Sequence, residues 1–280
     1  MLVLLILSRT LGLSARPVGA INPAAFSRGA CVAFAPTHGD RNLTVFLDAG
    51  HGGLDPGSVG TTESGRTVHE ANVTLPVELD TSALLRGAGF RVVVSRTGNT
   101  AVARLGPADV ANDALTVKGV HDDVAARDVC ANDAHANVLV GIYFDAGAPS
   151  NAGSVTGYDA VRSFADDNVR LANLVQYDVL AAMNARGWNI PNAGVVPDSQ
   201  LGSSLTDRSV RYGHLLLLGP AARGWFSTPS AMPGVLIEPL FITDPFEGSI
   251  AASRDGQHVI ATGLASAIEQ YFAPARRSSR

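Results

Sequence analysis

The sequence has little positive charge, no long apolar run and almost no cysteine, and each shortage excludes a class of protein. Charged residues make up 16% of the 280 residues, and the formal net charge is -4. The Lys and Arg residues are scattered rather than gathered into one stripe, so no nucleic acid is expected as a partner. No apolar run reaches the roughly 18 to 20 residues that a helix needs to cross a bilayer. An integral membrane protein is therefore not expected.

Cysteine occurs only twice, as Cys31 and Cys130. The pair could form a disulfide in an oxidising compartment, but two free buried thiols suit a chain of this size equally well. The first twenty residues open with an apolar stretch and end in the small residues of a signal cleavage site, although no basic segment precedes them. They form either an export signal or an element of the fold. The first alternative predicts a secreted or cell-envelope protein, in the periplasm or cell wall.

With 46% hydrophobic residues the chain can bury a large core. Apolar runs that suit buried strands alternate with helical segments, which predicts an α/β fold with a mostly parallel central sheet and helices on both faces. Strands are expected at 43–48, 90–95, 138–144, 214–218 and 235–241, and helices at 70–86, 121–136, 165–185 and 250–272.

The expected organisation is a leader over 1–40, made of a possible export signal and an extension, then one catalytic domain over 41–273 and a frayed tail over 274–280. Pro76 lies inside the first predicted helix and should kink it or delay its start. The segment 98–119 is expected to be an inserted loop.

Polar residues follow several of the predicted strands, at the edge where ligands of open α/β sheets collect. His51 comes after the first strand, Glu70 opens the next helix, and Tyr143 and Asp145 end the central strand. An imidazole and a carboxylate suit zinc. Alone, the sequence GHGG around His51 is weak, because such a turn is as often an ordinary loop or a phosphate-binding loop. His69-Glu70 begins a zinc-protease HExxH pattern, but Val73 stands where the second His is needed.

Glu238 lies within the apolar strand VLIEPLF. A carboxylate is costly to bury there unless it is paired, hydrogen-bonded or bound to a metal. The structural alternative is an ion pair with a buried Arg127; the functional one is a catalytic role.

Four segments, taken in order, resemble the family of N-acetylmuramoyl-L-alanine amidases with a zinc-hydrolase-like α/β fold, over about residues 44–272. They are VFLDAGHGGLDPGSVG, the helix opened by Glu70, AARDVCAND with Arg127, and MPGVLIEPLFITDPFE. The resemblance implies Zn²⁺ as cofactor, His51 and Glu70 as ligands, and Glu238 as catalytic base. It also implies hydrolysis of the bond between N-acetylmuramic acid and L-Ala, with peptidoglycan as partner.

The family's third metal His is replaced, since the chain has GIYFDAG with Tyr143 at that place. A phenol, with a pKa near 10, must lose its proton to bind zinc well. Asp145 lies two residues further on and shares a strand face with Tyr143, so it could complete a set of His51, Glu70 and Asp145. The substitution also leaves a second interpretation open, a peptidoglycan-binding pseudoenzyme that has lost tight metal binding.

Other residues are weaker candidates for the site. His135 and His214 are the remaining sources of a nitrogen ligand, but both are expected to be ordinary histidines away from the strand ends. Asp48 either orients His51 through its second ring nitrogen or caps the turn. A serine hydrolase is excluded because no G-x-S-x-G sequence occurs.

Overall fold

The computed structural model describes residues 18–201 and 206–274, so the apolar start of the expected export signal and the last six residues lie outside the described part. An eight-stranded sheet, in the order β1-β2-β6-β3-β9-β12-β10-β11, runs through the centre. Its strands are β1 (Gly19–Ala20), β2 (Ala30–Phe34), β3 (Thr44–Ala49), β6 (Arg91–Arg96), β9 (Val138–Ile142), β10 (Ser154–Tyr158), β11 (Asn192–Pro197) and β12 (Gly234–Glu238). Two small hairpins, β4 (Val59–Thr61) with β5 (Thr67–His69) and β7 (Val110–Ala111) with β8 (Ala114–Leu115), lie outside it.

The four central strands β6, β3, β9 and β12 are parallel. Strands β2 and β10 run antiparallel to their neighbours β6 and β12, and β11 is parallel to β10. The carboxyl ends of β3, β9 and β12 therefore meet at one edge of the sheet, whereas those of β10 and β11 point to the opposite edge. This direction change separates the two polar clusters described below.

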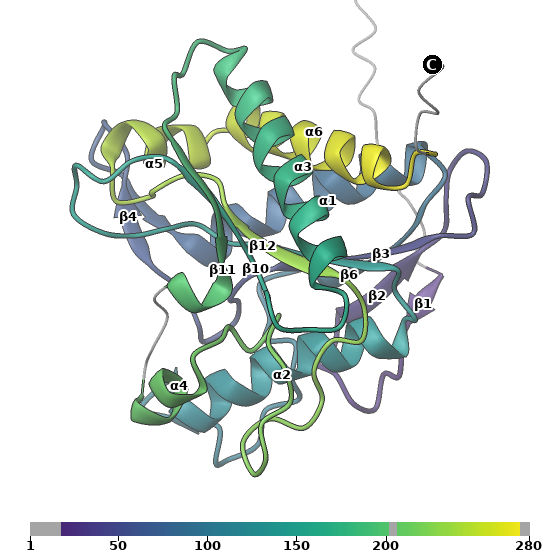
Figure 1. Ribbon diagram of the computed structural model, residues 1–280. Helices are drawn as coiled ribbons and strands as arrows, with labels where there is room; N and C mark the ends of the chain where they lie inside the picture. The colour runs from purple at the N-terminus through teal and green to yellow at the C-terminus, as the bar shows by residue number, and fades with distance from the viewer. Residues whose placement is uncertain (1–17, 202–205, 275–280) are drawn as a thin grey trace, which may run out of the picture.

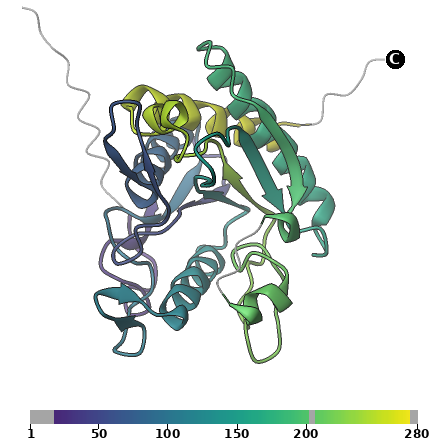
Figure 2. The same ribbon diagram turned by 90° about the vertical axis from the view of Figure 1, so that its left-hand side faces the viewer.

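Helices cover both faces of the sheet, which confirms the predicted architecture (Figure 1). Helices α1, α3 and α6 pack on one face, and α2 packs on the other. The segment that bears α4 also lies on the α2 side (Figure 2). The helices are α1 (Glu70–Gly87), α2 (Val117–Asp133), α3 (Ala165–Asn184), α4 (Asp207–Tyr212), α5 (Pro245–Ala251) and α6 (Arg254–Tyr271), with a short 3-10 turn at Asp198–Gln200. Among the described residues no helix is long and apolar enough to cross a membrane.

The alternation of side chains along β3 shows how the two apolar layers form. Val45 and Leu47 pack into the layer under α1, α3 and α6, while Phe46 packs into the layer against α2. All three side chains are fully buried. Because both faces of the strand are covered, its sequence is a continuous apolar run rather than an alternating one.

Several predicted elements need correction. The leader expected over residues 1–40 contributes β2, whose residues pair with β6 inside the sheet. Strands β10 and β11 were not expected, because SVTGY and NAGVVP contain few large apolar residues. The strand expected at 214–218 is wrong: Leu217 and Leu218 are buried against the α2 side of the sheet from a turn. Helix α1 starts at Glu70 and continues through Pro76, so the proline does not delay the start of the helix.

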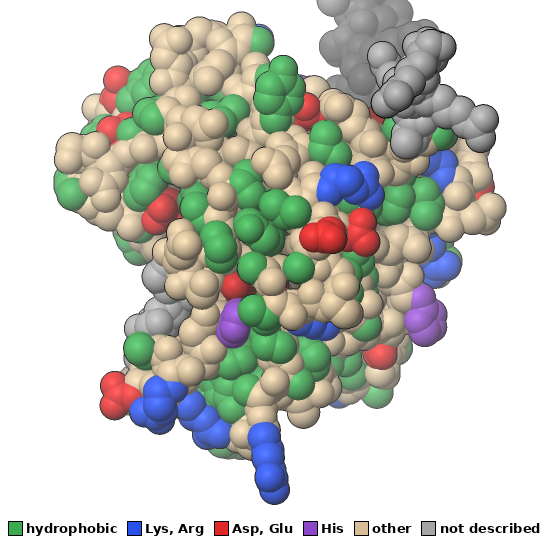
Figure 3. Space-filling view, in the orientation of Figure 1, with side chains coloured by type: hydrophobic (Ala, Val, Ile, Leu, Met, Phe, Trp, Pro, Cys, Tyr) green, Lys and Arg blue, Asp and Glu red, His purple; other side chains and the backbone are tan. Residues whose placement is uncertain are grey.

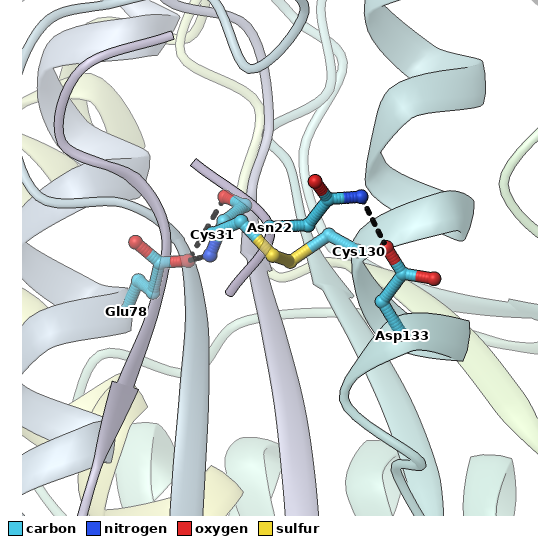
Figure 4. Close-up of a disulfide and its surroundings, with 6 residues drawn as sticks. Asn22, Cys31, Glu78, Cys130 and Asp133 are labelled. Atoms are coloured by element: carbon cyan, nitrogen blue, oxygen red, sulfur yellow. Dashed lines mark hydrogen bonds between the residues drawn. A yellow bond between two sulfur atoms is a disulfide. The ribbon is translucent and has the colours of Figure 1, made fainter. Parts of the chain in front are cut away.

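The two cysteines form a disulfide that joins β2 to α2 (Figure 4). Cys31 and Cys130 are both fully buried in the apolar layer on the α2 side. Beside the bridge, Asn22 donates a hydrogen bond to Asp133 over 3.2 Å. The alternative of two free thiols is therefore excluded, and the helix that carries Arg127 is covalently tied to the sheet.

Candidate active site

His51 lies in the turn that follows β3, and two buried arginines hold that turn. His51 has a positive φ of 62°, which is uncommon for a residue with a side chain and marks a conformation imposed by its surroundings. Arg127 donates to the carbonyl of His51 over 2.9 Å and to that of Ala49 over 2.8 Å. Arg96 donates to the carbonyls of Ala49 and Gly50. The backbone carbonyls of residues 49 to 51 are thus all held by hydrogen bonds from the two guanidinium groups.

The imidazole of His51 lies between two carboxylates, one at each ring nitrogen. Its Nδ1 is 2.8 Å from Asp55 Oδ2, and its Nε2 is 3.1 Å from Glu70 Oε2. Burial disfavours the charged ring, but the hydrogen bonds to Asp55 and Glu70 outweigh it and raise the pKa of His51 to about 10. Without a metal the ring is therefore an imidazolium that satisfies both carboxylates.

Glu70 is the first residue of α1, and its buried carboxylate connects three segments. Its Oε1 accepts from the backbone N–H of Phe144, just after β9, over 2.9 Å. Its Oε2 accepts from the N–H of Ser58 over 2.9 Å and also faces His51. Gly57 leaves room for this arrangement, since a Cβ there would lie 2.7 Å from both Glu70 and His51. The position of Glu70 is therefore fixed by backbone groups from two loops.

Glu238 ends β12 at the same edge of the sheet. Burial and the charges of Asp145 and Glu70 raise the pKa of Glu238 to about 8, and the charge of His51 opposes the shift. Arg127 is not its partner, because that guanidinium pairs with Asp48 and Asp123 instead. The structural alternative for Glu238 is wrong. A carboxyl group with a pKa near 8 changes its protonation state close to neutral pH.

The Tyr143 ring packs edge-on against the ring of His51, with the ring centroids 5.3 Å apart, and lies on the α2 side of the sheet. Its hydroxyl donates to Asp48 Oδ2 over 3.1 Å, and burial and the Asp48 charge hold its pKa well above 10. Tyr143 is therefore a neutral phenol that stabilises Asp48. Burial raises the pKa of Asp145, and the charge of Glu70 raises it further. The charge of Asp145 in turn helps to raise the pKa of Glu238, so the three carboxyl groups lie within range of one another's charges.

The role expected of Asp48 needs correction. Asp48 is fully buried and accepts from Arg127 and Tyr143, so the residue that orients His51 is Asp55. Sequence analysis missed Asp55, although it stands four residues after His51 in the same GHGGLDPG segment. A carboxylate that follows a candidate metal His in a glycine-rich turn is the signal that would have found it.

The two histidines that were set aside have different surroundings. His135 follows α2 with a positive φ of 48°, away from the other site residues. His214 faces two buried carboxylates, its Nδ1 lying 3.0 Å from Asp159 Oδ2 and 3.2 Å from Asp198 Oδ1. Asp159 and Asp198 follow β10 and β11, two strands that were not predicted, so sequence reasoning had no strand ends on which to place them.

A sequence profile of the Amidase_3 family, described as N-acetylmuramoyl-L-alanine amidase, matches residues 45–270. The AmiA amidase of Salmonella typhimurium is 28% identical over 238 residues, which cover 81% of this chain and 75% of that protein. AmiA of Escherichia coli is 26% identical, with coverage of 81% and 75%. The matched range contains every site residue described above.

Solved structures with similar folds include an N-acetylmuramoyl-L-alanine amidase from Clostridium difficile 630, with a TM-score of 0.55 and 25% identity over 82% of this chain and 96% of that one. The CwlD amidase from Clostridioides difficile, solved in complex with the GerS lipoprotein, has a TM-score of 0.61 and 20% identity, with coverage of 82% and 98%. The second likeness concerns the fold alone.

Proposed function

This chain belongs to the family of N-acetylmuramoyl-L-alanine amidases, and from that premise we propose that it is a zinc-dependent amidase acting on peptidoglycan. The scissile bond would be the amide between the lactyl group of N-acetylmuramic acid and L-Ala of the stem peptide. The observation that supports the proposal is the 3.1 Å contact between His51 Nε2 and Glu70 Oε2, with Glu238 near enough for the charges of both to act on its carboxyl group. The three residues come from segments far apart in sequence: the turn after β3, the start of α1 and the end of β12.

The donors present suit zinc in their chemistry. His51 Nε2 and Glu70 Oε2 lie 3.1 Å apart, about the spacing of roughly 3.4 Å between two ligand atoms of a tetrahedral zinc. The hydrogen bond that the Tyr143 hydroxyl donates to Asp48 argues against Tyr143 as the third ligand. We assign the third position to Asp145, whose carboxylate must move closer to join the ion, because the ligand atoms of His51, Glu70 and Asp145 do not all lie within 4.8 Å of one another in the described structure. When bound, the ion would polarise the amide carbonyl and lower the pKa of a water molecule.

Glu238 is the proton carrier in this proposal. It takes a proton from the attacking water as the water oxygen bonds to the carbonyl carbon, and it delivers that proton to the departing amide nitrogen of L-Ala. The C–N bond breaks, and the products are a lactyl carboxylate and a free amino group.

Asp48, Arg127 and Asp55 act on His51 rather than on substrate. Arg127 fixes the backbone of the His51 turn while paired with Asp48, and Asp55 accepts from Nδ1 so that Nε2 is left for the metal. A carboxylate behind a metal-bound histidine typically changes metal affinity or activity by 10- to 100-fold.

The disulfide supports a location in the cell envelope or outside the cell. Cys31 and Cys130 are bonded, and such bonds persist in oxidising compartments. Peptidoglycan is likewise part of the cell envelope.

On the face shown in Figure 3, Lys and Arg side chains gather near α4 and are sparse elsewhere, so no basic stripe crosses this face.

Zinc depletion and reconstitution test the proposal. Purified protein is stripped with a chelator, dialysed and given muropeptides with or without Zn²⁺, and free stem peptide is measured by mass spectrometry. We expect release only after zinc is restored. Release by the stripped protein would contradict zinc dependence. Muropeptide binding without release at any zinc concentration would identify the chain as a binding pseudoenzyme.

A further inference from the structure

A second group of potential ligands lies away from the site just described. Within the described residues, one set of three His, Cys, Asp or Glu side chains has ligand atoms that all lie within 4.8 Å of one another: Asp159, Asp198 and His214. Asp159 follows β10 and Asp198 follows β11. Tyr158 pairs with Val235 whereas Val155 pairs with Glu238, so Asp159 lies roughly 13 Å or more along the sheet from Glu238.

Both carboxylates face the same nitrogen of His214. Asp159 Oδ2 is 3.0 Å and Asp198 Oδ1 is 3.2 Å from Nδ1. A single N–H on Nδ1 satisfies one of these oxygens, and Asp159 Oδ2 is buried without a hydrogen bond. A fully buried carboxylate oxygen without a partner is costly. An ion between the three groups removes that cost.

The remaining oxygens of the two carboxylates are held by the backbone. Asp159 Oδ1 accepts from the N–H groups of Val161 and Arg162, each over 2.8 Å. Asp198 Oδ2 accepts from the N–H of Leu215 over 2.9 Å. Each carboxylate therefore uses one oxygen to fix its orientation and turns the other toward His214. Metal ligands are commonly oriented in this way by hydrogen bonds outside the coordination sphere.

The charge of the cluster also favours a divalent cation. Asp159 and Asp198 are 0% and 1% exposed, and in the described part of the chain His214 is the one basic side chain within 4.0 Å of either. Arg162 lies nearby but donates to the carbonyls of Leu218, Gly219 and Ser230. Two buried carboxylates thus share at most one positive charge, and a dication supplies the missing one.

We propose that Asp159, Asp198 and His214 form a second zinc site. One imidazole nitrogen with two carboxylate oxygens suits zinc better than calcium or magnesium, which prefer oxygen alone. The separations of 3.0 and 3.2 Å are close to the roughly 3.4 Å between ligand atoms of a tetrahedral zinc. His214 is 19% exposed, so water can complete the coordination.

The ion would attach residues 206–233, which we call the covering segment and which lie on the α2 side, to the sheet. Leu201 lies over Gly157 of β10, and Leu217 lies over Gly141 of β9. Both leucines belong to the stretch between Asp198 and β12, and His214 sits between them in sequence. A metal bound by His214, Asp159 and Asp198 would attach this part of the chain to the ends of β10 and β11, at a point between the two leucine contacts. The role is structural and independent of hydrolysis.

Zinc binding in a variant without the first site tests the proposal. The double variant His51→Ala/Glu70→Gln is stripped of metal and titrated with Zn²⁺, with calorimetry and mass spectrometry as readouts. We expect one equivalent to bind and the thermal midpoint to rise by several degrees. Adding His214→Gln or Asp198→Asn should weaken that binding at least about tenfold and abolish the rise, whereas adding His258→Ala at an exposed position should change neither.

Two outcomes would overturn the second site. The first is a double variant that binds no zinc while its circular dichroism spectrum matches that of the wild type, which leaves His214 as an ion-pair partner only. The second is one equivalent of zinc that still binds unchanged when His214 or Asp198 is replaced in a folded protein. Because the first site is removed from the start, neither result depends on whether the chain is an amidase.

Discussion

The two imidazole clusters contain the same kinds of side chain but arrange them differently. In the first, Asp55 and Glu70 face different nitrogens of His51, and a doubly protonated ring satisfies both. In the second, Asp159 and Asp198 face one nitrogen of His214, so one oxygen is left without a hydrogen bond. Which ring nitrogen each carboxylate faces, and not the kinds of side chain present, therefore decides whether the ring N–H groups can satisfy both carboxylates.

The supports of the two clusters differ as well. Arg127 holds the first through a buried ion pair with Asp48 and bonds to the carbonyls of Ala49 and His51. Arg162 lies beside the second and donates to the carbonyls of Leu218, Gly219 and Ser230, and it pairs with no carboxylate of the described residues. Removal of each arginine should therefore have a different cost.

Replacing these arginines gives the largest expected effect. Arg127→Met leaves Asp48 and Asp123 buried without a cation and should lower the free energy of unfolding by about 3–5 kcal/mol. Arg162→Met loses hydrogen bonds to neutral carbonyls and should cost about 1–3 kcal/mol. Urea denaturation of both variants measures the difference. Equal losses would show that the Asp48 pair contributes nothing special to the first cluster.

The disulfide should support the first cluster more than the second, because it ties α2 to β2 and touches neither β10 nor β11. The bridge closes a loop across 99 positions, and the variant Cys31→Ala/Cys130→Ala should lose about 2–4 kcal/mol of unfolding free energy. Hydrogen exchange should speed up more in α2 than in β10. A uniform increase would contradict the assignment of the bridge to one side.

Glu78 extends the comparison to a buried carboxyl group with no imidazole beside it. Burial raises its pKa from 4.5 to about 8, although the charge of Arg96 opposes the shift. An acid with a raised folded-state pKa contributes stability that is fully present below the unfolded value of 4.5 and is lost as pH rises through 8. Glu78→Gln should therefore reduce the stability loss between about pH 5 and 8, by about 1–3 kcal/mol, in denaturation curves. An unchanged pH profile would show that Glu78 is ionised in the folded protein.

Tyr143→His should have the smallest effect of these substitutions, a change in the free energy of zinc binding, and it tests the metal site of the first cluster most specifically. The new imidazole supplies a neutral nitrogen where a protonated phenol stands, and zinc affinity should rise at least about tenfold. Calorimetry with zinc, in a His214→Gln background, measures this. Tyr143→Phe is the matched control and should leave the affinity as it is. A gain in the Phe variant would mean that the hydroxyl obstructs the metal rather than failing to bind it.

The first cluster was accessible from sequence to the extent that its residues follow strong apolar strands. His51 and Glu70 stand at the ends of predicted elements that the structure contains. Glu238 was predicted inside a strand over 235–241, and the structure ends that strand at Glu238, at the same sheet edge as the end of β3. Asp48 was placed at the site with the wrong partner, because one strand position does not determine whether a side chain meets a histidine or a helix behind it.

The second cluster was not accessible in the same way. Strands β10 and β11 have few large apolar residues, since β11 lies at the edge of the sheet and β10 contains Gly157 under Leu201. The run of four leucines at 215–218 predicts a strand, but Leu217 and Leu218 are buried against the α2 side of the sheet from a turn. Without those elements, Asp159, Asp198 and His214 had no common place.

Turnover by Glu238→Gln tests most directly the claim that the first cluster is a hydrolytic centre. Release of stem peptide from muropeptides should fall by about 100-fold or more while bound zinc stays equal to that of the wild type. The exposed Glu269→Gln is the control for a carboxylate-to-amide change and should keep full activity. An unchanged rate in Glu238→Gln, with zinc bound, would contradict the account.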